Sequence, residues 1–117
     1  MCPLGVKMNI DNFDYEQTVM NIIVNAGACR SYAMQALALA KVGNADEAGL
    51  MMEQADDALK QAHKVQTELI GLDEGSGKVP VHLIMVHAQD HLMNAILLKD
   101  LAAEFIDIYQ KLSALEN

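Results

Sequence analysis

Three stretches of this chain repeat apolar residues at steps of three and four, which is the spacing of one face of an α-helix. They cover about 15–42, 45–70 and 80–113. Between them lie Gly43 and the segment 71–80, GLDEGSGKVP, which holds three glycines and a proline. Because Gly and Pro interrupt helices, the pattern predicts an all-α fold, an antiparallel three-helix bundle with one short and one longer connection.

Residues at the breaks suggest where each helix begins and ends. Lys41 suits the negative end of the first helix, and Gly43 can take the left-handed conformation that often follows a helix. Asn44 and Glu47 have the spacing of a capping box, which predicts that the second helix begins there. Pro80 is a residue preferred in a first helical turn and predicts the start of the third helix.

The chain length of 117 residues fits a single domain over 15–117, preceded by a segment, 1–14, that we expect to be loosely ordered. Met8 is an alternative start of translation. Within the third pattern, 11 of the 16 residues from 83 to 98 are apolar. Two neighbouring helices cannot easily cover a helix that is apolar on nearly every side, so the pattern predicts self-association, and composition leaves dimer and trimer open.

Charge and hydropathy exclude several kinds of partner. The formal net charge is −8 and the eight basic residues are scattered, which argues against nucleic acid and against an anionic membrane surface. No signal-peptide core and no run of about 18 apolar residues is present, so no membrane insertion is expected. Two cysteines without metal-ligand spacing favour a reducing, cytoplasmic compartment.

A polar stripe interrupts the apolar segment MVHAQDHLMNAILLKD. At about 100° per residue, four side chains share an arc of about 100° on the third helix: His87, Asp90, His91 and Asn94. Gln89 and His82 point to the far side of the same helix.

The residue types of this stripe allow several interpretations. Buried or interfacial histidines with satisfied hydrogen bonds are one. A metal-dependent hydrolase is another, because His87, Asp90 and His91 have the His-x-x-acid-His order of some zinc enzymes. A third is nucleophilic catalysis, since a neutral imidazole can accept a phosphoryl group and release it again. A helical adaptor without chemistry remains a further alternative.

Three segments together resemble a known family. VHAQDHLMNAILLKD, with NAGACRSYAMQAL of the first helix and QAHKVQTELI of the second, is similar to the IIA component of the lactose and cellobiose class of the bacterial phosphoenolpyruvate-dependent sugar phosphotransferase system. The resemblance implies that His87 accepts a phosphoryl group on Nε2 from the phosphocarrier protein HPr. His87 then passes it to a cysteine of the IIB component during sugar uptake.

The same resemblance implies an assembly and a metal. Members are homotrimers of three-helix subunits, and Asp90 is expected on the threefold axis around a divalent cation, often magnesium. His91 is a candidate to support the phosphoryl group, while the roles of His63 and Gln89 stay open. Ala88 stands where lactose-type members carry Gly, and at this position the chain is more similar to cellobiose and diacetylchitobiose members. The resemblance therefore favours a β-linked disaccharide as the sugar.

Overall fold

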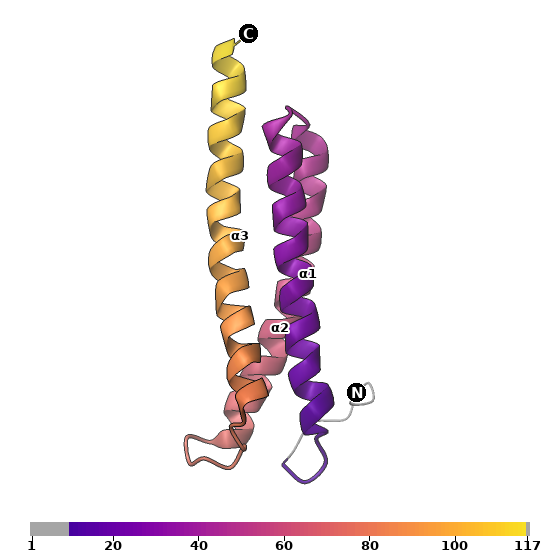
Figure 1. The fold of residues 1–117 in the computed structure, drawn as a ribbon, viewed down its shortest axis with the longest axis vertical. Coiled ribbons are helices and arrows are strands. Elements are labelled where there is room, and N and C mark those ends of the chain that lie inside the picture. Colours follow the sequence, from indigo (N-terminus) through magenta and orange to yellow (C-terminus); the bar gives the residue numbers. More distant parts are fainter. Residues whose placement is uncertain (1–9, 117) are drawn as a thin grey trace.

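The computed structural model describes residues 10–116, and in this part of the chain it contains three helices: α1 (Tyr15–Lys41), α2 (Ala45–Asp73) and α3 (Leu83–Glu116). They run up, down and up in a bundle with extents of 60 × 26 × 18 Å (Figure 1). The predicted all-α architecture is confirmed. Residues 1–9, which form most of the predicted N-terminal segment and include Met8, lie outside the described residues.

The turn between α1 and α2 corrects one prediction. Gly43 has a φ of 84°, as its place after α1 requires. Asn44 precedes α2, but its side chain makes no capping hydrogen bond, so the predicted capping box does not form. The short turn holds the Asn44 backbone at φ −93° and ψ 71°, because its amide donates to the carbonyl of Leu39 at 2.9 Å. That backbone is far from the extended conformation of a typical N-cap.

The start of α3 corrects another prediction. Pro80 does not lie in the first helical turn, since the helix begins at Leu83. The carbonyl of His82 accepts hydrogen bonds from the amides of Met85 and Val86, at 2.9 and 3.2 Å, and therefore takes the initiating position. The His82 amide in turn donates to the Tyr15 hydroxyl at 3.2 Å. This contact ties the first turn of α3 to the first turn of α1.

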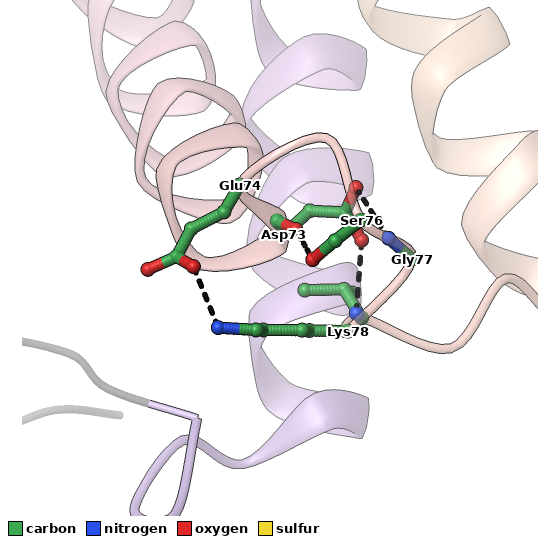
Figure 2. A network of polar contacts seen from close by, with 6 residues as sticks. Asp73, Glu74, Ser76, Gly77 and Lys78 are labelled. Atoms are coloured by element: carbon green, nitrogen blue, oxygen red, sulfur yellow. Dashed lines mark hydrogen bonds and ion pairs between the residues drawn. The ribbon is translucent and has the colours of Figure 1, made fainter.

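Asp73 organises the connection between α2 and α3. Its carboxylate accepts hydrogen bonds from the amides of Gly77 and Val79, at 3.3 and 3.0 Å, and Lys78 pairs with Glu74 at 2.6 Å (Figure 2). Val79 is buried in the bundle. The connection is therefore fastened at both ends, to the last turn of α2 and to the core.

The core is built largely from alanine, and its largest fully buried side chains are Val19, Ile22, Cys29 and Leu92. Small side chains let the helices approach closely, but each contributes little apolar area. Of the three helix pairs, α2 and α3 contact each other least. The C-terminal end of α3 projects beyond the other two helices (Figure 1). One subunit therefore leaves much of α3 uncovered.

Candidate functional site

His87 and His91 form a pair on α3. They are four residues apart, so successive turns place them on the same side of the helix. Their ring centroids are 4.6 Å apart and the ring planes meet at 81°, an edge-to-face arrangement. His87 is exposed and His91 is half-buried. The imidazole of His87 is therefore accessible to another molecule, and the imidazole of His91 packs against it.

Asp90 lies on a different face from the histidine pair. It is displaced by about 60° from His87 around the helix and is exposed. The residues that the structure describes contain no group of three or more His, Cys, Asp or Glu side chains able to hold a metal. The predicted stripe is thus present, but within one chain His87, Asp90 and His91 do not form a ligand set. The metal-dependent hydrolase interpretation loses its main support.

The apolar residues around Asp90 are not buried within the subunit. The sequence pattern predicts that two neighbouring helices cannot cover the first half of α3, and the exposed apolar residues of the single subunit agree with it. Steps of three and four residues along α3, passing through the exposed Asp90, connect one exposed apolar seam: Leu83, Val86, Met93, Leu97, Leu101, Phe105, Ile108, Leu112 and Leu115. We call these nine residues the α3 seam. Each is at least 46% exposed, so the seam is a continuous apolar face.

The remaining polar residues considered for the site lie in four different environments. Asn94 is exposed beside the histidine pair. Gln89 points toward α2, where its side-chain oxygen accepts a hydrogen bond from the Gln66 amide at 2.6 Å. His82 packs its ring against Tyr15, with centroids 5.5 Å apart. His63 is exposed on α2.

Sequence reasoning missed an ion pair that joins α2 to α3. Asp56 pairs with Lys60 at 3.0 Å, as its helical spacing predicts, and also with Lys99 at 2.9 Å. Hydrogen bonds from Lys99 first, and from Lys60 second, lower the pKa of the Asp56 carboxyl. The sequence does indicate that Lys99 faces the bundle, because on the helical wheel of α3 it falls about 20° from the buried Leu92.

Cys29 is enclosed by the core between α1 and α3. Its thiol lies 4.0 Å from the carbonyl oxygen of Ala95. Burial raises the pKa of the Cys29 thiol, and the nearby Lys99 partly offsets this increase. A buried, protonated thiol is unreactive, so Cys29 is a core residue and not a candidate nucleophile.

The three helices and the imidazole pair define a helical-bundle protein with an exposed histidine on α3. Comparison with known proteins then identifies the family, because residues 17–110 match the family described as PTS system, Lactose/Cellobiose specific IIA subunit. The chain belongs to this family, as the resemblance predicts, and is a component of a sugar phosphotransferase system.

Individual relatives agree over nearly the whole chain. The lichenan-specific phosphotransferase enzyme IIA component of Bacillus subtilis is 48% identical over 102 residues, which are 87% of this chain and 93% of the relative. The cellobiose-specific enzyme IIA of Bacillus anthracis has a crystal structure that superimposes with a TM-score of 0.82, at 48% identity, covering 87% of this chain and 94% of that one.

A third relative was solved together with a partner. The Escherichia coli chitobiose IIA in complex with HPr has a TM-score of 0.75 at 46% identity, covering 86% of this chain and 98% of that one. As for membranes, none of the helices in residues 10–116 combines the length and the apolar character that a membrane span requires.

Proposed function

We propose that this protein is a phosphoryl carrier that uses His87 as its acceptor. The observation that carries the proposal is the accessible His87 imidazole, set edge-to-face against the half-buried His91, in a chain of the IIA family. The donor is phospho-HPr and the acceptor is a cysteine of a IIB component. The E. coli chitobiose relative, solved in complex with HPr, supports the choice of donor.

The chemistry needs only side chains of the three proteins. The lone pair on Nε2 of His87 attacks phosphorus, a new P–N bond forms, and the P–N bond of the donor histidine breaks. In the second half-reaction the thiolate of IIB attacks the same phosphorus, a P–S bond forms, and the His87 imidazole leaves. The phosphoryl group moves without a change in oxidation state, and no cofactor carries it.

His91 supports the phosphorylated state in this proposal. Phosphorylation adds negative charge to a chain whose net charge is already −8. Four lysines, Lys60, Lys78, Lys99 and Lys111, are engaged in ion pairs with carboxylates away from the histidines. The ring of His91 lies one helical turn from His87, with the centroids 4.6 Å apart, and a hydrogen bond from its N–H would stabilise the phosphoryl oxygens.

The α3 seam is the proposed homotrimer interface. Nine exposed apolar side chains on one helix face are far more than a soluble monomer normally leaves open. Packing three copies of α3 around a common axis would cover them and would also enclose the projecting end of the helix (Figure 1). The proposed sugar is a β-linked disaccharide of the cellobiose or chitobiose kind, and the proposed compartment is the cytoplasm.

Asp90 is the proposed metal ligand of this trimer. Lying between Val86 and Met93 of the seam, it would bring three carboxylates to the axis, where they repel unless a cation bridges them. Oxygen ligands fit a hard divalent cation such as magnesium. Asp90 also makes no hydrogen bond or ion pair with another described residue. The cation would hold subunits together and take no part in phosphoryl transfer.

Phosphorylation in a reconstituted relay tests the proposal. Wild-type protein mixed with phosphoenolpyruvate, Enzyme I and HPr should gain one acid-labile, alkali-stable phosphate per chain, and His87→Ala should gain none. His63→Ala is the matched control, because His63 is another exposed helical histidine, and it should behave as wild type. Full phosphorylation of His87→Ala would refute the assignment. Failure of the wild type, with the seam still binding helices, would favour the adaptor alternative.

A further inference from the structure

The Gln66–Gln89 hydrogen bond lies immediately behind the histidine pair. The Gln66 amide on α2 donates to the side-chain oxygen of Gln89 on α3 at 2.6 Å, and the Gln89 amide lies 3.5 Å from the sulfur of the buried Met85. Gln89 follows His87 by two residues and points about 200° away from it around the helix. The hydrogen bond between Gln66 and Gln89 therefore holds the side of this helical turn that lies opposite His87.

This hydrogen bond joins the two helices that have the least extensive contact in the bundle. The α2–α3 contact is the least extensive of the three helix pairs. Among the described residues, the polar side-chain contacts between these two helices are Gln66–Gln89 and Asp56–Lys99. Their α3 members are ten residues apart, or about 15 Å along the axis. Asp56–Lys99 thus joins α2 to the middle of α3, and the glutamine pair is the polar side-chain contact from α2 at the histidine turn.

We propose that Gln66 and Gln89 are positioning residues that set the rotation of α3 about its own axis at the histidine turn. This inference rests on the proposed function of His87. A helix with its side chains has a radius of about 5–6 Å, so a rotation of about 10° moves an outer side chain by about 1 Å. A displacement of about 1 Å can slow a positioned reaction by as much as about 100-fold. The glutamine pair controls this displacement from the opposite side of the helix.

Paired charge substitutions separate this role from ordinary packing. Gln89→Glu keeps the oxygen that accepts from Gln66, and Gln66→Glu can accept from the Gln89 amide after a side-chain flip, so each single variant keeps a hydrogen bond. The double variant Gln66→Glu/Gln89→Glu sets two carboxylates against each other with the side-chain shapes preserved. The proposal therefore predicts a strongly non-additive effect.

The rate of phosphoryl transfer from phospho-HPr is the first measurement. The kcat of Gln66→Glu and of Gln89→Glu should remain within about threefold of wild type. The double variant Gln66→Glu/Gln89→Glu should lose about tenfold or more in kcat, with KM for phospho-HPr little changed. Gln54→Glu/Gln61→Glu, which adds the same charge at two exposed positions of α2, should keep the wild-type rate. Gln66→Met, which keeps the length of the side chain without its donor, should slow transfer in the same direction.

Nuclear magnetic resonance of the imidazoles is the second measurement and does not depend on phosphorylation. The ring resonances of His87 and His91 should shift in the double variant and in Gln66→Met, and should match wild type in the Gln54→Glu/Gln61→Glu control. Wild-type ring resonances and a wild-type rate in a folded double variant would overturn the positioning role. A wild-type protein that accepts no phosphate would instead refute the proposed function, whatever the resonances show.

Discussion

Truncating Leu97 tests the trimer seam at its centre. Leu97 is 59% exposed in the subunit. Burying a leucine side chain completely is worth about 1.5–3 kcal/mol, so about 1–2 kcal/mol remains to be gained when another subunit covers it. Leu97→Ala removes most of this favourable free energy of association, or about 1 kcal/mol per subunit and about 3 kcal/mol per trimer. At about 1.4 kcal/mol per tenfold, the trimer association constant should fall about 100-fold.

Sedimentation equilibrium over a range of protein concentrations measures this effect directly. Because the trimer forms from three monomers, its midpoint concentration varies as the inverse square root of the association constant and should rise about tenfold. Ile70→Ala is the matched control, since Ile70 is 64% exposed but lies on α2, away from the seam. Leu97→Ala with an unchanged midpoint, or Ile70→Ala with an equal shift, would refute the seam as the interface.

Two further predictions concern charged residues of α3 and its neighbour. Asp90→Leu should remove the bound cation and preserve or strengthen the trimer, whereas Asp90→Lys should disrupt the trimer. Elemental analysis measures the cation content and sedimentation measures the trimer. Unchanged cation content in Asp90→Leu would contradict the axial site. Lys99→Met should cost about 1 kcal/mol at pH 7 after allowance for solvent screening, and Lys60→Met clearly less, in urea unfolding at fixed protein concentration. Because Lys99 lowers the pKa of Asp56 in the folded state, its contribution is complete at neutral pH and is lost as the pH falls below about 4 through that lowered pKa. Equal losses for the two variants, or a Lys99→Met deficit that does not shrink as the pH falls below about 4, would contradict the role of the Asp56–Lys99 pair.

The helices were predictable because the periodicity is long and its interruptions are sharp. Local chemistry was a weaker guide to the ends of the helices. Pro80 has the preference of a first-turn residue, yet the Tyr15 hydroxyl fixes His82 and so delays the helix to Leu83. Asn44 has the side chain of a cap, yet a tight turn to Leu39 holds its backbone in the wrong conformation. In the first case a contact with α1 determined the result, and in the second the geometry of the turn itself did.

The candidate site was predictable only in part, for a related reason. Helical spacing places His87 and His91 on one side of α3, and the structure agrees. Spacing does not say which helix covers which face: the wheel places Lys99 beside the buried Leu92, but the identities of its partner Asp56 and of Gln66, the partner of Gln89, come from the three-dimensional structure. Likewise, an apolar residue in a pattern does not reveal whether its own subunit or another one covers it.

That last ambiguity explains how one short motif can serve two purposes. His87 and Asp90 are both exposed and are separated by about 60° around α3, and the acid lies between Val86 and Met93 of the seam. A rotation of α3 that improved the approach of one would displace the other. A trimer that fixes Asp90 on its axis and a glutamine pair that fixes the opposite face would therefore constrain the same rotation from two sides. On this reasoning, loss of the axial contact and loss of the glutamine contact should affect His87 in related ways, although neither contact touches the reacting imidazole.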